Sequence, residues 1–137
     1  MTILIAIPYY GVAPELIDKA VSHAVAQTGD VVVLVAGDGQ TPSISIKSSR
    51  LVIGTFPTNL GAPCTQQAMI LGSPFPWYAP HGADDWIEPN HVSSLLALGA
   101  PVNGSGTIWY HVPHRTQVFR SPRTYIEFGV LDTALLR

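Results

Sequence analysis

The hydrophobic positions of this sequence form two kinds of run, one continuous and one with helical spacing. Thr2–Ile7 and Val31–Ala36 are continuous, apolar and rich in β-branched residues, which is typical of strands buried on both faces of a parallel sheet. Between them, apolar residues recur every three to four positions from Pro14 until about Thr28, which predicts an amphipathic helix. The pattern therefore predicts a β-α-β unit with a right-handed crossover.

Shorter strands and helices are expected along the rest of the chain. The predicted elements are a short strand around Ile44–Ile46, a strand at Leu51–Ile53, a helix over about 62–71, a strand at Phe75–Pro80, a helix over about 89–98, a hairpin made by Thr107–Val112 and Gln117–Arg120, and a short helix at Pro122–Phe128. This order indicates one α/β domain over residues 1–137. We expect a mostly parallel, doubly wound sheet with helices on both faces and a late antiparallel hairpin.

Composition narrows the classes of protein that fit this pattern. Hydrophobic residues make up 47% of the 137 residues and charged residues 12%, which is enough apolar material for one core. The net charge is −2 and no basic cluster is present, so we expect no nucleic-acid partner. The single cysteine, Cys64, excludes an internal disulfide and favours a reducing, cytoplasmic location. Cys64 falls in a predicted helix, where we expect it to be buried.

The first apolar run is too short to act as a membrane span. It has no basic residues before it and ends at Pro8. We therefore expect neither a signal peptide nor a membrane-spanning segment.

Acidic residues gather in one stretch, His81–Pro89, in which Asp84 and Asp85 follow a predicted strand and precede a predicted helix. In an open α/β sheet, ligands bind at the carboxyl ends of the strands. Adjacent carboxylates repel each other, and they are best tolerated in open solvent or around a cation. Hard oxygen ligands of this kind select Mg²⁺ or Mn²⁺, which usually arrive with a phosphate. A solvated turn that caps a helix is the alternative interpretation.

Two further polar groups follow the first two strands. Tyr10 comes directly after the first strand, and Asp38 directly after the second, so both are expected at the same edge of the sheet. Asp38 is predicted on a surface turn. An aromatic face and a carboxylate are groups that the base and ribose of a nucleotide would use. A simple Asp-Gly turn is the alternative interpretation.

Five pieces of the chain, taken in order, resemble the GT-A glycosyltransferases of family 2. They are Ile5–Tyr10, the helix end Ala26–Thr28, Val33–Gly39, Asn59–Gly61 and Ala83–Pro89, and the stretch from Val118 to Asp132 resembles the elements that follow. The resemblance covers nearly the whole chain. It implies a Rossmann-like GT-A fold, a uridine or guanosine diphosphate sugar as donor, Mn²⁺ or Mg²⁺ as cofactor, and inversion at the anomeric carbon.

The resemblance also implies which residues bind the donor. In the family, these positions flank the nucleoside, contact the base, form an Asn-x-Gly turn, or belong to the D-x-D region that binds ribose and the metal. The matching residues here are Pro8, Tyr10, Asp38, Asn59, Gly61 and Asp84 for the nucleotide, and Asp84 and Asp85 for the metal.

The chain departs from the family pattern at three points. Gly82 stands where the family has an aspartate, which leaves open whether Asp84 or Asp85 holds the metal. Gly37 stands where the family has the first acid of an Asp-Asp-Gly-Ser turn. The sequence ends at Arg137, where the segment with the family's catalytic base would begin. We therefore expect that base and the acceptor-binding part to be missing.

Three residues remain as candidates for the base. Asp132 and Glu127 are the only late acids, and a turn acid and a helix-face acid are their alternative interpretations. His81 adjoins the acidic stretch and could contact phosphate or metal. His111 and His114 could bring a ligand to the metal, but two histidines are too few for a zinc site.

The leading hypothesis is a metal-dependent glycosyltransferase that uses a nucleoside-diphosphate sugar. One alternative is a nucleotide-sugar-binding module that performs no transfer. Another is a subunit whose partner chain or second copy supplies the acceptor side.

Overall fold

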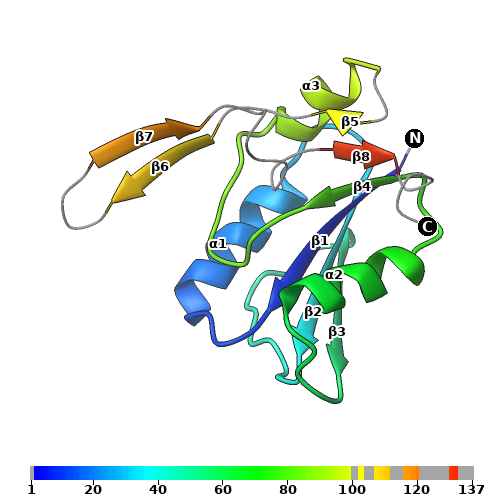
Figure 1. Ribbon diagram of the computed structural model, residues 1–137, viewed down its shortest axis with the longest axis vertical. Helices are drawn as coiled ribbons and strands as arrows, with labels where there is room; N and C mark the ends of the chain where they lie inside the picture. Colours follow the sequence, from blue (N-terminus) through cyan, green and yellow to red (C-terminus); the bar gives the residue numbers. More distant parts are fainter. Residues whose placement is uncertain (1, 100–101, 104–106, 112–115, 121–129, 133–137) are drawn as a thin grey trace.

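A six-stranded sheet forms the centre of the molecule in the computed structural model, which describes residues 2–99, 102–103, 107–111, 116–120 and 130–132 (Figure 1). Four neighbouring strands run parallel in the order β3-β2-β1-β4. They are β1 (Ile3–Tyr9), β2 (Val31–Asp38), β3 (Leu51–Phe56) and β4 (Trp77–Pro80). Beyond β4, β8 (Val130–Asp132) pairs antiparallel with β4, and β5 (Val102–Asn103) pairs antiparallel with β8. The mostly parallel sheet expected from the sequence is confirmed.

Helices cover both faces of the sheet. The helix α1 (Pro14–Val25) follows β1, α2 (Ala62–Leu71) follows β3, and α3 (His91–Leu96) follows β4. Ile3, Ile5 and Ile7 of β1 share a core with α1 and α3, whereas the residues between them, such as Leu4, share a core with Met69 of α2. Because both faces of β1 are buried, its sequence is a continuous apolar run. The sheet is doubly wound, as predicted.

A separate hairpin is formed by β6 (Thr107–His111) and β7 (Thr116–Arg120), which pair antiparallel from Thr107 opposite Arg120 to His111 opposite Thr116. Figure 1 shows this pair of strands projecting away from the six-stranded sheet. The hairpin predicted from the sequence is confirmed. The predicted helix at 122–128 lies outside the described residues. No helix in the described ranges is long and apolar enough to cross a membrane.

Two expectations about the middle of the chain are wrong. Residues 41–48 contain no strand; Ile44 and Ile46 pack against the core on the α1 face, and the Asp18 carboxylate accepts hydrogen bonds from the Ser45 backbone N–H, at 2.9 Å, and hydroxyl. Side-chain anchoring to α1 therefore replaces the ladder that a strand would need. Cys64 lies in α2 as predicted but is exposed, because it falls on the face of the helix that points away from the sheet core.

Candidate functional site

The strand order reverses beside β1. The chain runs from β1 to β2 and β3 on one side and then returns to β4 on the other side. In open α/β sheets, ligands bind outside the carboxyl ends of the strands at such a reversal. Two loops flank this point: Tyr10–Gly11 after β1, and the turn Gly82–Asp85 after β4, which we call the acidic turn. The His81 N–H donates to the Ala6 carbonyl at 3.0 Å, so the sheet ladder holds the chain up to the start of that turn.

The two carboxylates of the acidic turn differ in their exposure to solvent. Asp84 is exposed and Asp85 is half-buried. The Asp85 carboxylate folds back over Gly82, where a Cβ would lie 2.1 Å from Asp85 Oδ2. A side chain at position 82 and this placement of Asp85 therefore exclude each other. The Asp85 carboxylate occupies the space that an aspartate at position 82 would need, which the sequence alone did not reveal.

His81 lies beneath the acidic turn and is only 1% exposed. Its Nδ1–H donates to the Gly82 carbonyl at 2.7 Å, which fixes the ring against the first residue of the turn. Burial lowers the pKa of His81 to about 4, helped by the charges of His91 and His23 and opposed by the Gly82 carbonyl and Asp84. The imidazole is therefore neutral at pH 7, and it supports the turn from below.

Asp38 is not on a surface turn, and that expectation is wrong. It is the last residue of β2, and it is 2% exposed. Its carboxylate accepts hydrogen bonds from the backbone N–H groups of Leu60 at 2.5 Å and Gly61 at 2.9 Å. Asp38 thus joins the end of β2 to the Asn-x-Gly turn before α2. The physical reason is that the two N–H groups lie directly before a helix, where no carbonyl of that helix can accept from them.

The structure brings Asp38, Asn59 and Gly61 together at the end of β2. Asn59 is exposed, and its side-chain oxygen accepts from the Gly61 N–H at 3.1 Å, so the turn folds on itself. Gly61 has a φ of +83°, a conformation that glycine adopts without strain.

Tyr10 lies at the same edge of the sheet and is 58% exposed, so its ring is available to a ligand. Pro8, inside β1 opposite Ala36, is half-buried. The Gly11 N–H donates to Gln40 Oε1 at 2.8 Å, which ties the loop after β1 to the loop after β2. Sequence reasoning missed Gln40, because a long polar side chain in a loop carries no spacing signal.

A second missed group holds the segment directly after the acidic turn, residues 86–89, which we call the exit segment. Lys19 Nζ lies 3.6 Å from the centre of the Trp86 ring, and His23 Nδ1–H donates to the Ile87 carbonyl at 3.1 Å. Gln27 Nε2 donates to the Glu88 carbonyl at 2.6 Å. The three α1-side residues are four positions apart, which is a visible signal, but the sequence could not show which segment they contact.

Of the candidate bases, His81 adjoins the acidic turn, whereas Asp132 lies away from it. Asp132 pairs with Trp77, at the amino end of β4, whereas the acidic turn follows the carboxyl end of the same strand. Glu127 and His114 lie outside the described residues, and His111 ends β6 in the separate hairpin.

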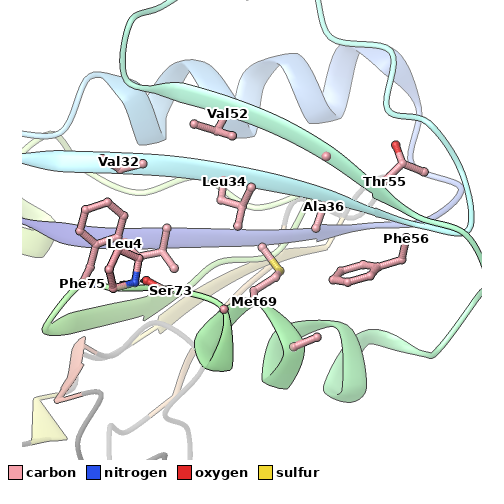
Figure 2. Close-up of a pocket in the computed structure, with 14 residues that line it drawn as sticks. Leu4, Val32, Leu34, Ala36, Val52, Thr55, Phe56, Met69, Ser73 and Phe75 are labelled. Atoms are coloured by element: carbon pink, nitrogen blue, oxygen red, sulfur yellow. Dashed lines mark hydrogen bonds between the residues drawn. The ribbon is translucent and has the colours of Figure 1, made fainter.

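An apolar cleft of about 470 Å³ lies on the α2 face of the sheet. Figure 2 shows Leu34 and Ala36 of β2 facing Met69 of α2, with Phe56 and Phe75 at the two ends. Among the described residues that line it, none is acidic, basic or a histidine.

Asp84 and Asp85 are the two side chains of the acidic turn that could bind a metal ion. Within the described part of the chain, no group of three or more His, Cys, Asp or Glu side chains could hold an ion. Asp84 and Asp85 alone fit Mg²⁺ or Mn²⁺ that keeps its other positions for phosphate oxygens and water, which is a common arrangement for Mg²⁺.

No protein-family model matches the sequence, and no curated protein sequence matches it. Crystal structures of S. aureus TarS, a GT-A glycosyltransferase, are similar over 99% of this chain. The TM-score is 0.65 at 17% identity for TarS 1-349, 0.69 at 16% for TarS 1-349 in complex with UDP-GlcNAc, and 0.67 at 16% for TarS. This chain spans 48%, 46% and 29% of those chains. The likeness shows that the fold is the Rossmann-like GT-A fold expected from the sequence.

Proposed function

We propose that this chain binds a nucleoside-diphosphate sugar at the carboxyl edge of the sheet and acts in glycosyl transfer. The observation that carries the proposal is the acidic turn at the strand-order reversal, with Tyr10 and Asp38 at the ends of the two neighbouring strands. The likeness to TarS supports it, since one matched structure holds UDP and another UDP-GlcNAc. A uridine nucleotide is therefore the first ligand to test, and a guanosine nucleotide the second.

In this proposal each part of the edge has its own task. The Tyr10 ring stacks on the base, and Pro8 flanks the nucleoside. Asp38 is buried and orders the Asn59–Gly61 turn, and through that turn it shapes the nucleoside side of the edge. Asp84 binds ribose or metal, and Asp85 binds metal.

The metal in this proposal is Mn²⁺ or Mg²⁺, held by Asp84 and Asp85 together with the diphosphate. Such an ion, when bound, neutralises the charge that develops on a leaving diphosphate. The half-buried position of Asp85 over Gly82 supports its role, because a fixed carboxylate needs little reordering to bind.

A nucleotide-sugar-binding module without transfer is the second candidate. It is favoured by the positions of the proposed bases: His81 is buried with its Nδ1 on the Gly82 carbonyl, and Asp132 is at the opposite end of β4. In this case the chain would bind the donor, and another chain or segment would supply the base. Inversion at the anomeric carbon, which the family resemblance implies, belongs to the transferase alternative.

Calorimetry with UDP, UDP-GlcNAc and GDP, each with Mn²⁺ and with chelator, tests the proposal. We expect binding that weakens strongly in chelator and in Asp84→Asn and Asp85→Asn. Asp30→Asn is a matched control, because Asp30 is an exposed aspartate at the amino end of β2, where it accepts from Thr2. Equal affinity with and without metal would refute the metal site, and no binding of any nucleotide would refute the function.

Assays of sugar transfer and of nucleotide-sugar hydrolysis separate the two candidates. A transferase releases UDP in step with a glycosylated acceptor, whereas the module binds the donor and releases UDP at most slowly. A general base typically contributes ~10²–10⁴-fold to the rate, so the difference is large enough to measure.

A further inference from the structure

One face of α1, continued just past the end of the helix, carries three polar side chains that contact three consecutive residues of the exit segment. Lys19 contacts the Trp86 ring, His23 the Ile87 carbonyl, and Gln27 the Glu88 carbonyl. Residues four apart lie one above another along a helix, which explains the match. We call Lys19, His23 and Gln27 the α1 stripe.

Gln27 has the most contacts of the three. It is 2% exposed, and its Nε2 donates to Glu88 O at 2.6 Å and to His23 O at 3.3 Å. Its Oε1 accepts from the Val92 N–H at 3.1 Å, inside α3. Next to it, the Thr28 N–H donates to the Pro89 carbonyl at 2.7 Å. One buried amide thus joins the end of α1 to both the exit segment and α3.

The acidic turn is therefore fixed at both ends. Upstream, the His81 N–H is bonded to Ala6 in the sheet, and downstream, Trp86 to Glu88 are bonded to the α1 stripe. Only four residues, Gly82–Asp85, lie between these anchors. A short loop with fixed ends has few conformations, so the anchors determine where the Asp84 and Asp85 carboxylates lie.

We propose that the α1 stripe positions the carboxylates of Asp84 and Asp85 and thereby sets the metal-dependent part of donor affinity. Removing a partner that is hydrogen-bonded to a metal ligand typically changes metal affinity by about 10- to 100-fold, and the α1 stripe acts on Asp84 and Asp85 through the backbone that directly follows them. The proposal rests on the proposed function, because it assumes that Asp84 and Asp85 bind the metal–diphosphate unit. Tyr10 and Asp38, at the ends of β1 and β2, lie outside the anchored turn.

Because Tyr10 and Asp38 lie outside the anchored turn, a change in the α1 stripe should affect only the metal-dependent part of UDP binding. Gln27→Met keeps the length of the side chain but removes its hydrogen bonds to Glu88 and Val92. We expect it to weaken UDP binding in Mn²⁺ by about 10- to 100-fold and to leave UDP binding in chelator unchanged. Lys19→Met should weaken the same Mn²⁺-dependent part to a smaller degree, and Lys19→Arg should restore it, because arginine keeps a cation over the Trp86 ring.

Arg50→Met is the matched control. Arg50 Nη1 donates to the carbonyls of Val25 at 3.3 Å and Gln27 at 2.8 Å, so it holds the same helix end, but from the start of β3. If Gln27 only stabilised the fold, both variants would lose affinity in proportion to their loss of stability in urea. Equal losses in the two variants, or unchanged Mn²⁺-dependent affinity in Gln27→Met, would overturn the inference.

Hydrogen exchange decides the inference independently of any ligand. We expect faster exchange at the amides of residues 84–86 in Gln27→Met than in Arg50→Met, measured on the intact chain. Absence of UDP binding by the unmutated chain would refute the proposed function, and exchange would still test the stripe. Unchanged exchange at these amides in Gln27→Met would overturn the inference that the α1 stripe positions the acidic turn.

Discussion

The carboxylate of Asp85 lies over Gly82, and the two positions share a space that only one side chain can fill. The atom that a Cβ at position 82 would meet is the tip of the Asp85 side chain, 2.1 Å away, and that tip can rotate aside. A substitution at Gly82 should therefore move the carboxylate without damaging the fold.

Gly82→Ala should displace the Asp85 carboxylate. We expect the free energy of unfolding to change by less than about 1 kcal/mol and Mn²⁺-dependent UDP affinity to fall by about tenfold. Calorimetry and urea unfolding measure the two quantities. Gly54→Ala is the control, because a Cβ on Gly54 meets no atom within 4 Å. If Gly82→Ala binds UDP and Mn²⁺ like the unmutated chain, the position of Asp85 over Gly82 has no role in binding.

Asp38→Ala should destabilise the fold. The Leu60 N–H would lose the carboxylate that accepts from it, and the Gly61 N–H would keep only Asn59 Oδ1, next to a buried strand end. Hydrogen bonds to charged groups contribute roughly 1.5–3 kcal/mol each, so we expect a loss of about 2–4 kcal/mol in urea unfolding. Asp38→Asn keeps one acceptor oxygen and should lose about half as much. A midpoint unchanged by Asp38→Ala would show that water replaces the carboxylate at no cost.

Stability should fall as the pH is lowered through the range in which His81 titrates. Burial lowers the pKa of His81 to about 4 in the folded state, below the ordinary value of 6.5 that applies to the unfolded chain. Between these values the unfolded state binds more protons, so stability is complete above about pH 6.5 and decreases toward pH 4. We expect a loss on the order of 1–3 kcal/mol from this residue. Urea unfolding of His81→Gln should show a flatter dependence on pH; an equally steep one would assign it to other groups.

Cys64 should react with a thiol reagent in the folded protein. It is the only cysteine of the chain and is exposed on α2. We expect one thiol to be labelled without denaturant, at a rate within about tenfold of the unfolded chain, because thiol reactivity follows exposure as well as pKa. A native rate slower by several orders of magnitude would show that Cys64 is covered in solution.

The predictable part of the fold came from patterns that depend on burial. Ile3–Ile7 is apolar throughout because both faces of β1 are covered. Val31–Ala36 is apolar because one face of β2 is buried, while the partly buried Val32 and Leu34 on the other face line the apolar cleft; these two runs predicted the parallel sheet. The residues 44–46 show the limit of the same reasoning. Ile44 and Ile46 alternate like a strand, yet they pack on the core from a loop that Asp18 anchors.

The candidate site was predictable in location but not in detail. Tyr10, Asp38 and the acidic turn meet at one edge because each follows the carboxyl end of a parallel strand. Asp38 is buried because the turn before α2 packs against it and donates to its carboxylate. Gln27 can act on the acidic turn because residues 86–92 pass beside it and form hydrogen bonds with its side chain. Contacts between segments more than twenty residues apart leave no periodic pattern, so single-sequence reasoning could not find them.

The close approach at Gly37 limits how this protein can be redesigned. A Cβ there would lie 1.7 Å from the carbonyl oxygen of Gln40 and 2.9 Å from Pro42 Cδ, and a backbone carbonyl cannot rotate aside as the Asp85 side chain can. An aspartate at position 82 needs only the space that the Asp85 side chain now fills. The double variant Gly82→Asp with Asp85→Ala would provide that space. Grafting an aspartate onto position 37 requires a new loop over residues 40–42. An engineer introducing an acid at one of these two positions would therefore begin at the end of β4 and leave the end of β2 unchanged.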